Sequence, residues 1–125
     1  MADPKLVRIR RNKHGIVQDC DLYIGRAINY GGWNLPQSKW HNPFTVKKYG
    51  STANVCDLYF KYIVESDLFH DLPELTGKTL GCWCEYTKNT NGFYCHGAVL
   101  IQLYKLVKYH NFDTKMVQSV LKGIL

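Results

Sequence analysis

The sequence predicts a small α/β domain with a mainly parallel sheet, and three observations lead to that prediction. Three short segments, 7–10, 20–24 and 79–83, have the composition and alternation of strands. Helical periodicity follows the second and the third of them. A strand, a helix and a further strand in this order form a right-handed crossover with parallel strands. We therefore expect helices packed on one sheet in a single domain, 1–125, of which residues 1–5 are expected to lack order.

The first strand alternates apolar and basic residues. Val7 and Ile9 are predicted to face the core, while Arg8 and Arg10 share the opposite face. A turn is expected next, at Lys13–Gly15, because glycine and polar residues interrupt the alternation there.

The second strand, Cys20–Ile24, ends at Gly25-Arg26, where glycine lets the chain turn sharply. A long irregular segment, 29–44, follows and contains two tryptophans, one of them Trp40. Because a solvated linker rarely holds two tryptophans, we expect an ordered loop that packs on the domain and contributes to function.

Apolar residues recur at helical spacing in three segments, of which the first can be capped by Ser51 or Thr52 and the third by Asp113. The three segments are 51–63, 96–109 and 113–124. Between the first and second of them, Ser66–Leu75 is expected to form a short helical turn that breaks at Pro73.

The composition limits the classes of function. Hydrophobic residues make up 46% of the chain, and no apolar run is long enough to cross a bilayer, so we expect no membrane partner. The charged segment 1–11 lacks the apolar core of a signal peptide. Five cysteines, two of them one residue apart, fit a secreted disulfide framework poorly. An intracellular location, cytoplasmic or nuclear, is therefore expected, and the net charge of +6 favours anionic partners.

Cysteine and histidine gather where the third strand gives way to a helix. Cys82 and Cys84 lie two apart and so share one face of a strand, while Cys95 and His96 open the helix. These four residues offer the ligands of a tetrahedral zinc site. The same group also suits a reactive centre, with Cys84 and His96 as the candidate catalytic pair. Buried, reduced core cysteines are the third alternative.

A second group of candidates surrounds the end of the second strand. Gly25 allows close approach of a ligand to the backbone, and Arg26 offers a bidentate donor to phosphate or carboxylate. Asn42 can hydrogen-bond a base or ribose, and Trp40 can stack on a ring. The alternative is structural, with Arg26 in an ion pair, Asn42 capping its own turn and Trp40 in the core. Ligands of α/β sheets bind beyond the carboxyl ends of the strands, where this group and the cysteines both fall.

Basic residues near the start of the chain form a candidate nucleic-acid face. They are Arg8, Arg10, Arg11 and Lys13. Lys47 and Lys48 extend the set, and the alternative is a solvated charged surface with no partner.

Four motifs in this order resemble an uncharacterised family, domain of unknown function 4326. The motifs are Tyr23-Ile24-Gly25-Arg26, Trp40-His41-Asn42-Pro43-Phe44, Leu80-Gly81-Cys82-Trp83-Cys84, and Cys95-His96-Gly97 with Val99-Leu100. They span about the first four-fifths of the chain. The family has no settled activity, so the resemblance indicates which residues belong to the site more than what the site does. Members usually carry an acidic residue after His-Gly, where this chain has Ala98, and a shorter segment between the cysteine pairs than 85–94.

The leading hypothesis is that the protein recognises a nucleotide-like or phosphorylated ligand, and its extension is that the protein also processes this ligand. It predicts a concave pocket lined by Arg26, Asn42, Cys84 and His96. The alternative is a zinc-stabilised module that binds nucleic acid weakly through its basic face. A further alternative is a viral or phage protein that binds a host protein through exposed aromatic residues.

Overall fold

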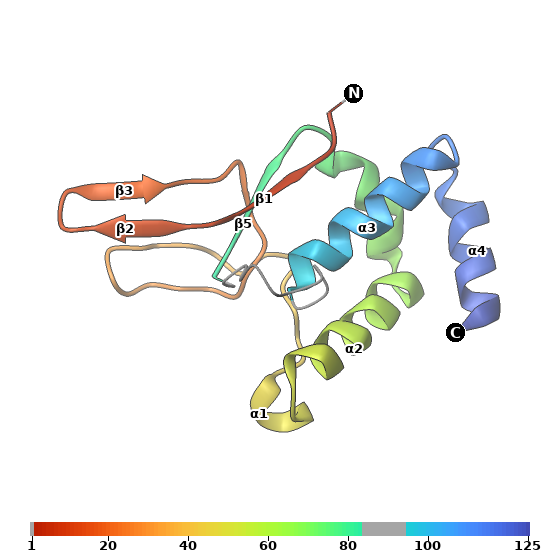
Figure 1. Cartoon of the computed structure of the whole chain (residues 1–125), viewed down its shortest axis with the longest axis horizontal. Helices are drawn as coiled ribbons and strands as arrows, with labels where there is room; N and C mark the ends of the chain where they lie inside the picture. Colours follow the sequence, from red (N-terminus) through yellow and green to blue (C-terminus); the bar gives the residue numbers. More distant parts are fainter. Residues whose placement is uncertain (1, 84–94) are drawn as a thin grey trace.

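A three-stranded parallel sheet lies at the centre of the computed structural model, which describes residues 2–83 and 95–125 (Figure 1). Its strands are β1 (Lys5–Arg8), β5 (Thr79–Cys82) and β4 (Leu22–Tyr23), in the order β1-β5-β4. Both neighbouring pairs are parallel. The predicted α/β class with a parallel sheet is therefore confirmed.

A β-hairpin projects from the opposite side of the molecule to the helices (Figure 1). It consists of β2 (Arg10–Asn12) and β3 (Gly15–Gln18), which pair antiparallel. This corrects the predicted first strand, 7–10, because the chain leaves the parallel sheet at the buried Ile9 and continues as the hairpin. The expected turn lies at its tip, where Gly15 has a φ of +123°.

The described part of the chain contains five helical segments. They are α1 (Val46–Tyr49), α2 (Thr52–Glu65), the 3₁₀ segment η1 (Asp67–Leu75), α3 (His96–Tyr109) and α4 (Thr114–Ile124). The predicted caps are present: the Ser51 hydroxyl accepts from the Asn54 N–H at 3.1 Å, and Asp113 caps α4. Pro73 was expected to break its segment but lies within η1, whose last turn continues to Leu75.

The chain from β4 to β5 forms a crossover between parallel neighbours. It contains α1, α2 and η1, and it returns so that Leu22 pairs with Leu80 and Tyr23 with Gly81. This register sets the carboxyl ends of β4 and β5 side by side, and the carboxyl end of β1 lies on the other side of β5. The segments that follow β4 and β5 therefore begin at one edge of the sheet.

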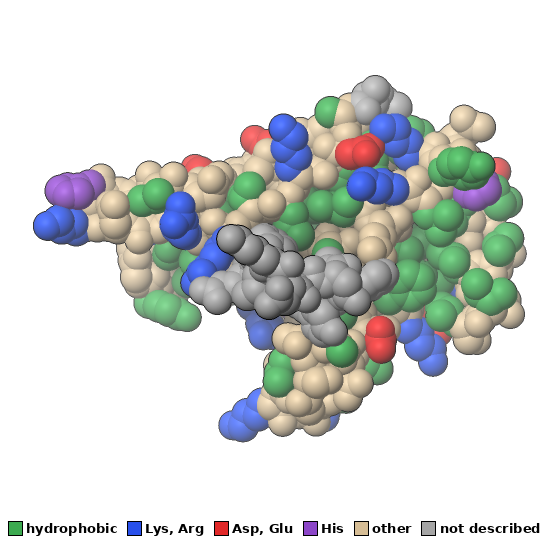
Figure 2. Space-filling model, in the orientation of Figure 1, with side chains coloured by type: hydrophobic (Ala, Val, Ile, Leu, Met, Phe, Trp, Pro, Cys, Tyr) green, Lys and Arg blue, Asp and Glu red, His purple; other side chains and the backbone are tan. Residues whose placement is uncertain are grey.

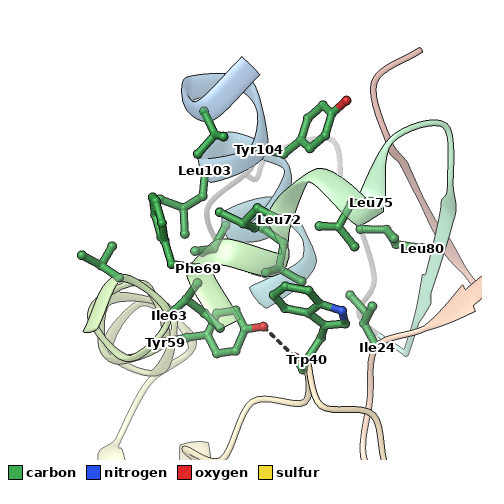
Figure 3. Packing of buried hydrophobic residues seen from close by; sticks show 14 of the residues in the cluster. Ile24, Trp40, Tyr59, Ile63, Phe69, Leu72, Leu75, Leu80, Leu103 and Tyr104 are labelled. Atoms are coloured by element: carbon green, nitrogen blue, oxygen red, sulfur yellow. Dashed lines mark hydrogen bonds between the residues drawn. The ribbon is translucent and has the colours of Figure 1, made fainter. Parts of the chain in front are cut away.

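The hydrophobic core lies between the sheet and the helices α2, η1 and α3 (Figure 3). Its largest fully buried side chains include Trp40, Tyr59, Phe69 and Tyr104. Each large apolar side chain removed from water contributes about 1.5–3 kcal/mol of transfer free energy. Among the helices that the structure describes, none is both long enough and apolar enough to cross a bilayer.

Candidate functional site

A cavity of about 470 Å³ opens at the carboxyl ends of β4 and β5. Its walls come from the chain after β4, the starts of α1 and α2, the end of β5 and the start of α3. The lining residues are Tyr23, Gly25, Arg26, Ala27, Ile28, Tyr30, Asn42, Phe44, Thr45, Val46, Thr52, Val55, Cys56, Cys82, Trp83, Cys95 and His96. A cavity of this size is typical of small-ligand sites.

Arg26 holds part of the cavity wall in place while keeping donors for other partners. Its Nη2 donates to the carbonyl oxygen of Asn42 at 2.6 Å and to that of Phe44 at 3.2 Å. A guanidinium has five N–H donors, so Nε and Nη1 retain three. No described residue accepts from these three or forms an ion pair with Arg26. Among the described residues, none therefore compensates the positive charge of this exposed guanidinium beside the cavity.

Asn42 fixes the loop that Arg26 tethers. Its Oδ1 accepts from the Phe44 N–H at 2.9 Å, which closes a turn of the side chain onto its own backbone. Its Nδ2 donates to the carbonyl of Val55 at 3.3 Å and so ties the loop to α2. Asn42 thus lines the cavity and also fills the turn-capping role that the sequence left as its alternative.

His96 joins the start of α3 to the end of β4. Its Nε2 lies 2.7 Å from the carbonyl oxygen of Ile24, and because a carbonyl can only accept, Nε2 carries the proton. In the neutral ring, Nδ1 is then the acceptor. The edge of the ring contacts buried Tyr59, with ring centroids 5.1 Å apart. His96 therefore has a defined tautomer at the cavity wall.

Three buried cysteines also line the cavity. The sulfur atoms of Cys82 and Cys95 lie 3.5 Å apart, and the Cys95 sulfur accepts from the Gly97 N–H at 3.4 Å as the cap of α3. Burial, with smaller contributions from Cys95 and Asp57, raises the pKa of the Cys56 thiol to about 11.

The predicted zinc set is only partly visible. Cys84 lies outside the described residues, and within 2–83 and 95–125 no three Cys, His, Asp or Glu side chains are grouped to hold a metal ion. Because the Nε2 of His96 is bound to a carbonyl, only its Nδ1 is available as a metal ligand. Zinc binding and the catalytic pairing of Cys84 with His96 stay predictions.

Aromatic side chains form the part of the wall nearest the sheet. The Trp83 Nε1 donates to the Tyr23 hydroxyl at 2.8 Å, and that hydroxyl donates to the Arg26 carbonyl at 2.6 Å. Trp33 packs edge-on against Trp83, with ring centroids 5.5 Å apart. Tyr30, on the same wall, is 72% exposed. The cavity thus presents ring faces and edges to a ligand.

Two helices of 14 residues begin at the cavity. Thr52 is the first residue of α2 and His96 the first of α3, and both line it. A helix N-terminus carries a partial positive charge and N–H groups that lack helical partners. None of the described lining residues is Asp or Glu. Within the described lining, the formal charge is therefore that of Arg26, and it is positive.

Not every predicted residue belongs to the cavity. For Trp40 the sequence offered either stacking on a ligand or a place in the core, and the residue is 1% exposed and packs in the core. Arg8, Arg10, Arg11 and Lys13 are exposed at the end of β1 and on the hairpin, outside the cavity lining. The structure thus separates the predicted basic face from the predicted ligand group.

Sequence comparisons identify the family. The family model for Domain of unknown function (DUF4326) matches residues 7–106. The chain belongs to this family. It is 65% identical over 124 residues to "Uncharacterized protein R718" of Acanthamoeba polyphaga mimivirus. The aligned region covers 98% of this chain and 95% of that protein. No solved structure matches it. The resemblance to the DUF4326 family is thereby confirmed.

Several lining residues of this DUF4326 chain were not singled out from the sequence. Tyr23 and Trp83 belong to two of the family motifs and were available as candidates on that ground. Thr52 was noted only as a possible cap, and Cys56 only as part of a helix. For these two no sequence signal exists, because the crossover brings the start of α2 to the sheet edge only in the folded chain.

Proposed function

We propose that the cavity binds a phosphorylated, nucleotide-like ligand. The observation that carries the proposal is the convergence of positive charge. Arg26 and the N-termini of α2 and α3 line one cavity, and the described lining contains no carboxylate. Helix N-termini are favourable sites for phosphate, and a guanidinium adds charge-assisted hydrogen bonds. An anion of this kind is the ligand that the walls would stabilise most.

The apolar part of the wall favours a ligand that also contains a ring. Tyr30 and Trp83 are exposed by 72% and 36%, and Phe44 and Ile28 continue the apolar surface. Aromatic side chains bind bases by stacking, which contributes about 1–3 kcal/mol per base. His96 lines the cavity, and its Nδ1 can accept a hydrogen bond from a donor of the ligand. Together these groups suit a base or other ring joined to a phosphate.

Binding can be tested with a charged and a neutral form of one ligand. We expect adenosine 5′-monophosphate to raise the melting temperature and to give a calorimetric isotherm, whereas adenosine should bind at least tenfold more weakly. Arg26→Ala should abolish the stabilisation, because a charged hydrogen-bond donor is lost while the core stays intact. Lys115→Ala is the matched control, since Lys115 is an exposed cation on α4.

Arg26→Ala also removes the tether to the loop, so a second variant is needed. Thr52→Asp places a carboxylate in the lining at the first position of α2. An acidic residue there favours the helix, so the fold should be retained while anion binding falls at least tenfold through like-charge repulsion. Equal binding of adenosine and its monophosphate, or unchanged binding by Thr52→Asp, would contradict the proposal.

We place this binding inside a cell, because five cysteines, an odd number with two of them one residue apart, fit a secreted disulfide framework poorly. The proposal concerns recognition. Processing of the ligand depends on Cys84, which lies outside the described residues, and on His96.

A further inference from the structure

The β2–β3 hairpin carries a concentration of positive charge that the cavity does not use. Residues 8–18 contain four cations and no carboxylate. Arg10, Arg11 and Lys13 are exposed, and within the described part of the chain none of the three forms an ion pair. The next acidic residues along the chain, Asp19 and Asp21, follow β3, where they accept from the N–H groups of Cys20 and Thr79. The hairpin is therefore a cationic arm.

A continuous series of contacts leads from this arm to the cavity. The Arg11 guanidinium lies over the Trp33 ring, 6.0 Å from its centroid, and it occupies the space beside Gly32, where any Cβ would clash with it. Trp33 in turn packs on Trp83, which lines the cavity. Arginine on an aromatic face, followed by further rings, is an arrangement typical of single-stranded nucleic-acid sites.

A second basic element lies on the other side of the cavity. Helix α1 places Val46 in the lining and Lys47 and Lys48 on the exposed surface. The Lys48 Nζ lies 5.4 Å from the ring centroid of Tyr49. Figure 2 shows basic side chains both along the hairpin and over α1. The cavity is thus flanked by cations and rings on both sides.

We propose that the nucleotide bound in the cavity belongs to a single-stranded nucleic acid, whose neighbouring phosphates contact the hairpin and α1. This inference rests on the proposed function and names its ligand class. A free mononucleotide would leave Arg10, Lys13 and Lys47 without a role, because all three lie outside the lining. A single strand fits better than a duplex, because a base must be unstacked before it can enter a pocket.

The test compares a single strand with a mononucleotide. A fluorescein-labelled 12-nucleotide DNA and the same sequence in RNA are titrated by fluorescence anisotropy, and adenosine 5′-monophosphate is titrated by calorimetry. We expect one or both strands to bind at least tenfold more tightly than the monophosphate. Each phosphate contact on a single strand should add about 0.7 to the negative slope of log K against log salt concentration.

Two variants separate the arm from the cavity. Arg10→Glu with Lys13→Glu should weaken strand binding at least tenfold, lower the salt slope and leave monophosphate binding unchanged. Its control is Lys115→Glu with Lys122→Glu, which makes the same change of charge on exposed positions of α4. Ala27→Trp fills the cavity from an exposed position of its lining, and it should weaken both ligands.

Each failure has a distinct pattern. If the monophosphate binds but the strand binds no more tightly, or the hairpin variant binds the strand normally, the inference is overturned and the proposed function stands. Strand binding that survives Ala27→Trp also overturns it, because the strand would then not enter the cavity. If the wild-type protein binds neither ligand, both proposals fall.

Discussion

Replacing Tyr59 with phenylalanine tests how the core supports the cavity wall. The Tyr59 ring is fully buried, and its hydroxyl donates to the carbonyl oxygen of Trp40 at 2.6 Å (Figure 3). Trp40 begins the 40–44 motif, so this bond fixes the start of the loop that Arg26 and Asn42 hold further on. The ring also contacts His96. Tyr59→Phe deletes one oxygen atom and keeps the packing.

The expected loss of stability follows from the buried carbonyl left without this donor. Leaving a buried acceptor unsatisfied costs about 1–3 kcal/mol. For a chain of this size, 1 kcal/mol corresponds to a change in melting temperature of roughly 4 °C, so the melting temperature should fall by about 4–12 °C. Tyr109→Phe is the matched control, because it removes the same atom from a ring that is 80% exposed.

The difference between wild type and Tyr59→Phe should depend on pH in a defined direction. Burial raises the pKa of Tyr59 well above its ordinary value of 10. Below pH 10 the hydroxyl is protonated in both states, and its contribution is complete. Above pH 10 the unfolded chain releases this proton and the folded chain does not, so the wild type loses up to about 1.4 kcal/mol per pH unit. The phenylalanine variant lacks this loss, so the difference in the free energy of unfolding between wild type and Tyr59→Phe should become smaller above pH 10.

Urea unfolding followed by circular dichroism at pH 7, 9 and 10.5 measures both effects, with Tyr109→Phe as the baseline at each pH. We expect a gap of about 1–3 kcal/mol at pH 7 and 9 that shrinks at pH 10.5. If Tyr59→Phe matches Tyr109→Phe at pH 7, the hydroxyl does not satisfy the Trp40 carbonyl and the reasoning is refuted.

Two further predictions concern the thiols. Burial raises the pKa of the Cys56 thiol to about 11 from an ordinary value of 9.0. Alkylation of Cys56 at pH 8 should therefore be about 100-fold slower than that of an ordinary thiol. The rate should rise about tenfold per pH unit until the pH reaches about 11. Mass-mapped iodoacetamide labelling measures this, and rapid labelling of Cys56 at pH 8 would contradict it. If Cys82, Cys84, Cys95 and His96 hold zinc, elemental analysis should find about one zinc per chain, and chelation should lower the melting temperature. Metal-free protein whose thiols all titrate would rule the zinc site out.

The elements that depend on local signals were predictable from the sequence. Helix α2 begins after the capping Ser51, and α4 begins after Asp113, as their side chains and apolar periodicity indicated. The position of the site followed from topology, because parallel strands have their carboxyl ends at one edge. That rule brought Arg26 and Cys82 to one cavity although 56 positions separate them.

The hairpin was not predictable, because it does not bury a face. In β2 all three residues are exposed, and in β3 the adjacent residues Ile16 and Val17 are 48% and 51% exposed. Strand prediction rests on an alternation that only a half-buried strand produces. Ile9, just before β2, is buried and lies where the parallel pairing ends. Its apolar side chain continues the alternation of β1, so the sequence indicates one continuous strand there.

Trp40 and Arg26 show why a residue type alone does not decide a role. A tryptophan in an irregular segment suits either a core or a ligand, and the structure uses Trp40 in the core. Arg26 has a structural role other than the ion pair that the sequence offered, since its Nη2 braces the loop through two carbonyls, and its other donors remain for a ligand. The two roles depend on each other. The carbonyls that receive Nη2 fix the orientation of the planar guanidinium, and a donor fixed before the ligand arrives loses less entropy on binding. A lysine at this position would keep the charge, but an ammonium bonded to both carbonyls would retain one N–H for a phosphate, whereas the guanidinium retains three.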